Sequence, residues 1–208
     1  VNVLKPPGMS SSDAVVDCRR IFGTKRVGHL GTLDPGAAGV LPVAIGRATR
    51  LFDYLIDKEK EYIAEIAFGA ATDTQDSYGI VTRTDKRIIF AQELESVLPS
   101  FIGSIDQTAP IYSALSVNGV KMYKLARSGQ VVEPRVRNIQ IHEASLLGRT
   151  GENRFLLRIR CSKGTFIRTI CADIGERLST CAHMSFLLRT ASGIFKIKNA
   201  KSIAELSE

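Results

Sequence analysis

The chain has 208 residues, of which 44% are hydrophobic and 24% are charged, a composition typical of a globular protein. No stretch approaches the ~20 consecutive apolar residues that a membrane-spanning helix requires, and the apolar run at the start of the chain is too short for a signal peptide. The formal net charge is +7, which indicates a polyanion as one candidate partner, although many globular proteins carry such a charge without binding nucleic acid.

The positive charge is concentrated in two stretches. Residues 1–50 contain seven Lys and Arg against three Asp and Glu, and residues 120–170 contain eleven against three, whereas residues 51–119 contain five against eleven. If the two basic stretches fold onto one face, that face suits a nucleic acid; a solvated surface is the alternative. The candidates for phosphate contacts are Lys121, Lys124, Arg127, Arg135 and Arg137.

The first predicted helix begins after Ser10, which can cap it, with Asp13 near the positive end of the helix dipole. Apolar residues then recur at helical spacing up to Phe22, and Gly23 ends the run. Residues 24–50 are rich in glycine and fit neither a regular helix nor a strand. They predict a long shaped loop, which in a compact domain is usually functional.

Residues 61–68 alternate in polarity with Tyr62 on the apolar face, so a strand is predicted there. A polar loop follows at residues 72–79, then a second strand at 80–84 and a helix at 90–98 that Pro99 ends. Within residues 103–140 we expect a turn at 118–119 and a short basic helix at 121–127.

Residues 154–162 give the clearest strand, and an apolar stripe beginning at Ile167 predicts a helix after it. Arg168 then lies in the first turn of that helix, where backbone N–H groups suit anionic partners. The order of elements predicts an α+β protein with a mixed or antiparallel central sheet and flanking helices.

The chain lacks the usual motifs for a metal or nucleotide site. Its four cysteines and three histidines show no zinc spacing, so we expect reduced thiols in a cytoplasmic protein. The glycine-rich loop is neither a phosphate loop nor a dinucleotide fingerprint. Asp34 precedes Pro35 and Gly36, which by itself is a common turn, but the glycines around it let the backbone approach a ligand closely.

Five ordered motifs resemble those of the TruB-type tRNA pseudouridine synthases. The central one is residues 28–35 (GHLGTLDP), followed by 39–42 (GVLP) and 46–50 (GRATR). The others are residues 5–11 (KPPGMSS), 60–62 (KEY), 72–76 (TDTQD) and 162–169 (SKGTFIRT). The matches span almost the whole chain, so the resemblance implies the pseudouridine synthase fold.

The resemblance implies that Asp34, Tyr62 and Arg168 are catalytic. Asp34 would be the essential carboxylate that acts on the ribose, by nucleophilic addition at C1′ or by deprotonation to a glycal. Arg168 would pair with Asp34, and Tyr62 would stack on the uracil. The reaction would isomerise uridine 55 in the T loop of tRNA, with the target base flipped out of the stack and without a metal or organic cofactor.

The same resemblance implies a set of substrate-binding residues: His29, Gly31, Asp76, Leu187, Lys5 and Lys163. His29 would wedge into the T loop, Asp76 would hold the Arg168 network, and Leu187 would form an apolar wall of the base pocket. Residues 1–208 would form one catalytic domain, with 103–140 as a tRNA-contacting insertion. The C-terminal RNA-binding PUA domain of many relatives is expected to be absent or cut off, and the protein is expected to be a monomer.

Several positions depart from the family pattern, namely Ala109, Ser116, Phe166 and Leu188, and two of them replace basic residues. Their loss would weaken RNA contact rather than chemistry. The main alternative is a non-catalytic RNA-binding or RNA-folding protein on the same fold, although such a protein has no need of the trio Asp34, Tyr62 and Arg168. A small glycoside hydrolase would need a second carboxylate, for which Asp76 is the candidate.

Overall fold

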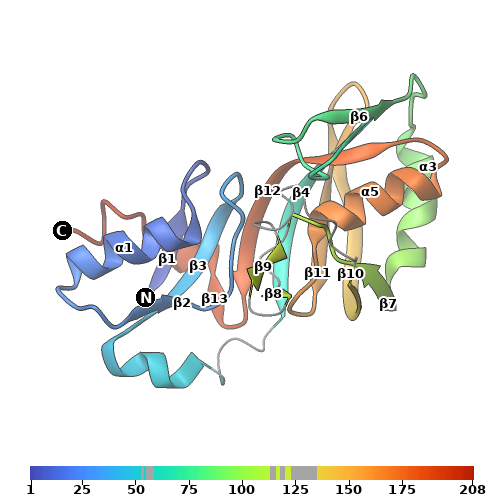
Figure 1. The fold of residues 1–208 in the computed structure, drawn as a ribbon. Coiled ribbons are helices and arrows are strands. Elements are labelled where there is room, and N and C mark those ends of the chain that lie inside the picture. The colour runs from blue at the N-terminus through green and yellow to red at the C-terminus, as the bar shows by residue number, and fades with distance from the viewer. Residues whose placement is uncertain (53, 55–58, 113–115, 118–119, 123–134) are drawn as a thin grey trace. The chain divides into compact units, whose positions relative to one another are not determined.

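The computed structural model describes residues 1–208 except 53, 55–58, 113–115, 118–119 and 123–134. The chain forms two compact units, which Figure 1 draws as ribbons. The first consists of Val1–Ile63, Arg160–Lys163 and Leu187–Glu208, and the second of Ala64–Ile159 and Gly164–Phe186. Three strands contribute residues to both units: β4 (Lys60–Phe68), β11 (Arg154–Cys161) and β12 (Ala182–Ser192). The expected single domain with its insertion stays a prediction.

The first unit is built around strand β3 (Ala38–Ile45). This strand pairs antiparallel with β1 (Asn2–Lys5) and β2 (Val27–His29), and parallel with β12. Helix α1 (Ser11–Ile21) packs beside β1 and β2. The remaining elements are the 3-10 helices η1 (Gly46–Leu51) and η3 (Ile197–Asn199) and the short strand β13 (Phe195–Lys196).

The second unit contains the strand order β12-β4-β11-β10-β7, with β7 (Gly103–Thr108) antiparallel to β10 (Val136–Gly151). Its helical elements are α3 (Ala91–Val97), η2 (Leu98–Phe101) and α5 (Ile167–Arg177). Two small hairpins complete it: β5 (Ala70–Thr72) with β6 (Val81–Thr84), and β8 (Ser116–Val117) with β9 (Val120–Lys121). The predicted α+β class with a mixed sheet is confirmed.

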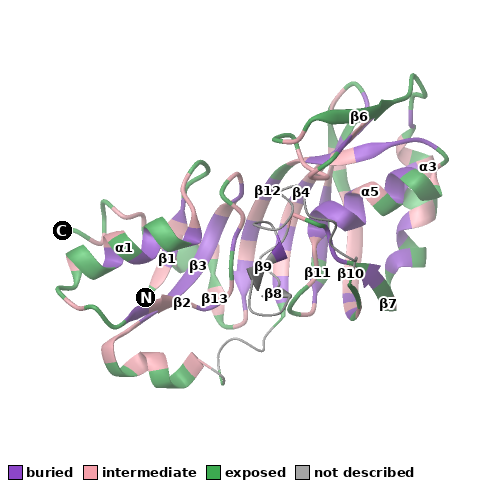
Figure 2. Cartoon of the chain, viewed as in Figure 1, coloured by how far each residue is buried: buried purple, intermediate pink, exposed green. Residues whose placement is uncertain are grey.

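The elements with clear periodicity form as predicted. Ser10 caps α1 through a reciprocal bond with Asp13. The alternating residues of β4 and β11 are buried on one face, and α5 buries its predicted apolar stripe. Figure 2 shows the buried residues of α5 in purple. The predicted helix at 90–98 is shorter, because α3 ends at Val97 and Pro99 lies in η2.

The prediction that residues 24–50 form one irregular loop is wrong. They contain β2, β3 and η1, and only residues 30–37 remain as an irregular segment between strands. Strand β3 gave no alternation because its neighbours cover it on both faces: Val40, Leu41, Val43 and Ala44 are all buried. The turn expected at 118–119 and most of the basic helix expected at 121–127 lie outside the described residues.

Gly39 sits where β3 meets β12, and the contact leaves no room for a side chain. It pairs with Arg189 and has a φ of +114°, which L side chains rarely adopt. A Cβ at this position would overlap the backbone oxygen of Arg189 and lie 2.8 Å from its backbone nitrogen. Glycine at position 39 is therefore required for β12 to pair with the strand that leaves the Asp34 loop.

We predict that Gly39→Ala lowers the free energy of unfolding by about 3 kcal/mol, because it adds a backbone clash to an unfavourable φ. Gly23→Ala is the matched control: Gly23 has a φ of +58°, but a Cβ added there would meet nothing within 4 Å. The control should cost only about 1 kcal/mol. Urea unfolding of both variants measures the difference, and equal losses would contradict the clash.

Candidate active site

Asp34 lies in the segment 30–37 of the first unit, at the start of a tight turn. The N–H of Ala37 donates to the carbonyl oxygen of Asp34 at 3.0 Å, with Pro35 at the second position of the turn. Asp34 is half-buried. The sequence thus places a carboxylate on a turn whose own backbone geometry is set by proline.

Ser11 binds Leu33, the residue before Asp34, at both the N–H and the carbonyl group of Leu33. The Ser11 hydroxyl donates to the Leu33 carbonyl at 2.9 Å and accepts from the Leu33 N–H at 2.9 Å. Ser11 is buried at the start of α1, so these bonds exclude water. In the sequence Ser11 was visible only as part of a motif, which gave it no role.

Lys5 binds the residue after Asp34. Its ammonium group donates to the carbonyl oxygens of Pro6, Met9 and Pro35 at 2.8, 2.6 and 3.2 Å, and the N–H of Gly8 donates to the Pro35 oxygen at 2.8 Å. Lys5 is fully buried. Burial lowers its pKa to about 8, while the charge of Asp34 opposes the shift. The structure places Lys5 behind the loop, and its expected role in substrate binding stays a prediction.

Arg189 binds the backbone at both ends of the same loop. Its guanidinium donates to the carbonyl oxygens of Gly31, Thr32 and Val40 at 3.4, 3.1 and 2.7 Å, and the residue is 1% exposed. Sequence reasoning did not assign Arg189 to the site. The available signal was an arginine on the same face of a strand as the apolar residues Leu187 and Ala191.

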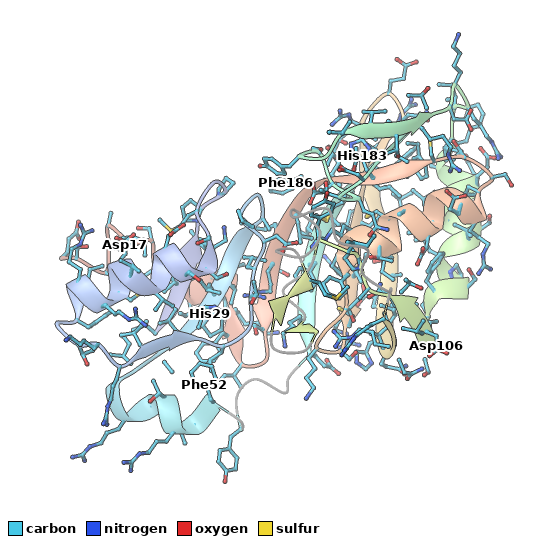
Figure 3. The ribbon with its side chains drawn as sticks, in the orientation of Figure 1. Asp17, His29, Phe52, Asp106, His183 and Phe186 are labelled. Carbon is cyan, nitrogen blue, oxygen red and sulfur yellow. The ribbon has the colours of Figure 1, made fainter. Side chains whose placement is uncertain are left out.

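Tyr62 and His29 belong to the same unit and lie within the field of Arg189. Burial raises the pKa of Tyr62; the positive charge of Arg189 lowers it and the negative charge of Asp34 raises it. His29 ends β2 (Figure 3), and burial together with Arg189 lowers its pKa, so the imidazole is neutral at pH 7. The structure therefore brings Asp34 and Arg189 within electrostatic range of both Lys5 and Tyr62.

The second unit positions Arg168. Gln107, which is fully buried on β7, donates to the Phe166 carbonyl at 3.0 Å and accepts from the Phe166 N–H at 2.8 Å, which fixes the residue before α5. Arg168 in the first turn of α5 donates to the carbonyls of Thr74 and Tyr112 at 3.2 and 2.8 Å.

Asp76 contacts Arg168 from the polar loop after β5. Their closest nitrogen and oxygen atoms lie 3.5 Å apart. Thr169 donates to the side chain of Gln75 at 2.8 Å, which ties the same loop to α5. The expected contact of Asp76 with Arg168 is thus present, whereas Asp34 belongs to the other unit and its pairing with Arg168 stays a prediction.

The other predicted site residues have varied environments. Leu187 is buried on β12, Lys163 is exposed after β11, and Gly31 has a φ of +103° and binds Arg189 through its oxygen. Of the candidates for phosphate contacts, Arg135 is exposed and Arg137 donates to the Gly164 carbonyl at 3.0 Å. Lys124, Arg127 and the side chain of Lys121 lie outside what the structure describes.

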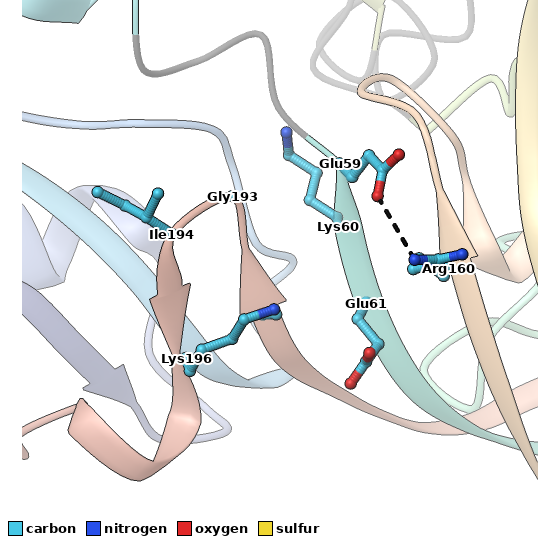
Figure 4. A pocket seen from close by; sticks show the side chains of 8 residues that line it. Glu59, Lys60, Glu61, Arg160, Gly193, Ile194 and Lys196 are labelled. Carbon is cyan, nitrogen blue, oxygen red and sulfur yellow. Dashed lines mark ion pairs between the residues drawn. The ribbon is translucent and has the colours of Figure 1, made fainter.

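A pocket in the first unit is lined by other residues. They come from Glu59 and the start of β4, from Arg160 of β11, and from β12, β13 and the turn between them (Figure 4). Glu59 and Arg160 approach to 4.0 Å across it. Since neither Asp34 nor Tyr62 lines it, this pocket is not the candidate active site.

The described part of the chain shows neither a cluster of metal ligands nor a membrane-spanning helix. Within that part, no three His, Cys, Asp or Glu side chains come together as metal ligands would. No described helix combines the length and the apolar character that crossing a bilayer demands. All four cysteines are buried thiols.

Comparison with known proteins identifies similar sequences along the whole chain. Residues 19–167 match the family model of the TruB family pseudouridylate synthase N-terminal domain, and residues 168–208 match that of the tRNA pseudouridylate synthase B C-terminal domain. The chain is 49% identical to tRNA pseudouridine synthase B of Pelotomaculum thermopropionicum, covering 99% of this chain and 67% of that protein. For the protein of the same name from Caldanaerobacter subterraneus the identity is 46%, covering 100% of this chain and 73% of that protein.

Solved structures show the same fold. A chain of a Cbf5-Nop10-Gar1 complex superimposes with a TM-score of 0.77 at 29% identity, covering 98% of this chain. A chain of an archaeal box H/ACA sRNP Nop10-Cbf5 complex gives a TM-score of 0.73 at 28% identity, covering 100% of this chain. The present chain spans about half the length of each of these solved chains, 52% in both cases.

We predict that Ser11→Ala lowers the free energy of unfolding by about 1–3 kcal/mol, because it leaves the N–H and carbonyl of Leu33 buried without their partner. Ser12→Ala is the matched control, since Ser12 is the next residue and is exposed. Its cost should stay within about 0.5 kcal/mol. Urea unfolding measures both, and similar values for the two variants would contradict the role of Ser11.

We also predict that Lys5 makes the free energy of unfolding depend on pH. Its pKa in the folded protein is about 8, below the ordinary value of 10.5, so the unfolded chain binds more protons between these values. The contribution of Lys5 to the free energy of unfolding therefore rises with pH across this window. In Lys5→Met that rise should be missing, and unfolding of both proteins from about pH 7 to about pH 10 measures it. Parallel curves would contradict the lowered pKa.

Proposed function

Because the chain belongs to the TruB family of pseudouridylate synthases, we propose that it converts uridine to pseudouridine in tRNA, at position 55 of the T loop. The reaction breaks the bond between N1 of uracil and C1′ of the ribose and forms a bond between C5 and C1′, while C5 loses a proton and N1 gains one. The observation that carries the proposal is the fixed loop around Asp34. Its peptide groups are bound on both sides by Ser11 and Lys5, so the carboxylate projects from a rigid turn.

A rigid carboxylate suits chemistry at the ribose. The target uridine must leave the base stack before its C1′ can meet a side chain. Asp34 then acts on the sugar, either by addition at C1′ or by deprotonation to a glycal. The reaction consumes no group donor and changes no oxidation state, so we propose that it needs neither a metal nor an organic cofactor.

We propose the remaining roles from the resemblance to the family. In the first unit, Tyr62 stacks on the uracil, neutral His29 wedges into the T loop, and Leu187 forms an apolar wall beside the base. Gly31 permits close approach of the backbone, and Lys163 contacts the RNA backbone as an exposed cation. Lys5 supports the loop that the substrate meets.

In the second unit, Asp76 and the carbonyls of Thr74 and Tyr112 orient Arg168. We propose that the guanidinium pairs with Asp34 and keeps that carboxylate ionised. The RNA-binding alternative leaves this arrangement unexplained, because an orienting network for one arginine adds nothing to non-catalytic affinity. We further infer that the protein acts as a monomer. We also infer that it works in the cytoplasm, where its buried cysteines stay reduced.

We predict that the protein forms pseudouridine at position 55 of an unmodified tRNA transcript, and that Asp34→Asn lowers the single-turnover rate at least about 10³-fold. Affinity for tRNA should change by less than about threefold, because phosphate contacts dominate binding. Position-resolved mapping of pseudouridine and filter binding measure the two quantities.

Asp17→Asn is the matched control, because Asp17 on α1 (Figure 3) forms an ion pair with exposed Arg20 at 3.2 Å and belongs to none of the site motifs. The control should retain full activity. Tight tRNA binding without pseudouridine from the unaltered protein would favour the RNA-binding alternative. Turnover of free uridine or short glycosides would instead indicate a hydrolase.

A further inference from the structure

We propose that Arg189 is a positioning residue of the active site, which fixes the loop of Asp34 at both ends and carries the positive charge that Tyr62 faces. This inference rests on the proposed function, because the reaction defines what must be positioned. Arg189 is not required to touch the RNA; it acts through the backbone that it binds.

The first argument is the geometry of its hydrogen bonds. Two nitrogens of the guanidinium bind the oxygens of Gly31 and Thr32, just before Asp34, and Nε binds the oxygen of Val40, just after the loop. The bonds to Thr32 and Val40 measure 3.1 and 2.7 Å. A single planar group therefore sets the separation between the entry and the exit of the segment that carries the carboxylate.

The second argument is that Arg189 itself is held firmly. Its backbone pairs with Gly39 in the register of β12 and β3, and the missing side chain of Gly39 allows this approach. The residue is 1% exposed. The guanidinium thus extends from a paired strand, and its hydrogen bonds hold the loop in a fixed position relative to that strand.

The third argument concerns charge. Burial raises the pKa of Tyr62 and lowers those of His29 and Lys5, and in each case the charge of Arg189 acts to lower the pKa. Its cation therefore lies within electrostatic range of three residues that the sequence assigned to the site. Burying a cation among carbonyl oxygens costs free energy. The presence of Arg189 at this position therefore favours a functional role for it. In the proposed reaction its field acts on the phenol of Tyr62 and on the neutral imidazole of His29.

A lysine at position 189 could replace only part of this function. Arginine presents five N–H donors in a rigid plane, and Arg189 uses three separate nitrogens to bind Gly31, Thr32 and Val40. Lysine carries all its donors on one nitrogen, so it cannot reproduce this planar spread of donors. Displacement of a catalytic group by about 1 Å can lower a rate about 10²-fold. Loss of Arg189 should therefore affect the chemical step rather than the binding of tRNA.

The experiment compares Arg189→Lys and Arg189→Met with the unaltered protein at a temperature where all are folded. Single-turnover pseudouridine formation should fall about tenfold in Arg189→Lys and about 10²-fold in Arg189→Met, with KM for tRNA within about threefold. Arg160→Lys is the matched control, since Arg160 on β11 is 47% exposed, and it should retain the full rate. The proposal is overturned if a higher KM for tRNA explains the loss of activity, or if the single-turnover rate is unchanged.

Hydrogen exchange supplies a readout that does not depend on activity. In Arg189→Lys the amides of residues 30–42 should exchange faster, while those of 154–161 stay as in the unaltered protein. Uniformly faster exchange indicates general destabilisation and overturns the proposal, as does unchanged exchange in the loop. If the unaltered protein forms no pseudouridine, the proposed function fails, and the exchange pattern still decides whether Arg189 fixes the loop.

Discussion

The first unit depends on one requirement: an irregular backbone segment inside a folded unit needs partners for its peptide groups. Residues 30–37 run between two strands and belong to neither, so a sheet does not supply hydrogen-bond partners for all of their N–H and carbonyl groups. Three side chains from distant parts of the sequence supply bonds to this segment, namely Lys5, Ser11 and Arg189. Each of these three buried polar side chains therefore has a backbone partner, and the loop has one conformation in which all of them are satisfied.

This arrangement has an electrostatic consequence. Lys5 and Arg189 are both buried cations, and Arg189 lowers the pKa of Lys5 as a like charge must. Asp34 raises the pKa of Lys5, so the carboxylate stabilises one of the cations that support its own loop. The support of the loop and the chemistry proposed for Asp34 are therefore coupled through this residue.

Periodic parts of the sequence predicted the fold best. The capped helix α1 and the strands β4 and β11 each bury one face more than the other, so the polarity pattern of the sequence predicts their burial. Strand β3 could not be recognised, because burial on both faces removes alternation and its glycine resembles a loop. The motifs identified Asp34, Tyr62 and Arg168 only by resemblance to a family. Arg189 escaped notice because its partners are backbone oxygens from residues far away in the sequence, which no local pattern reveals.

The two arginines in these arrangements follow one physical rule with different results. Both donate to backbone carbonyls, Arg168 to two and Arg189 to three, and both are almost fully buried. Arg168 in addition approaches the Asp76 carboxylate to 3.5 Å and sits at the start of a helix, so its charge is oriented by a second charge. The guanidinium of Arg189 instead donates to three carbonyl oxygens, which fix a group in space without neutralising it. This difference in partners fits the two proposed roles: Arg168 as the partner of the Asp34 carboxylate, and Arg189 as the support of the loop that carries Asp34.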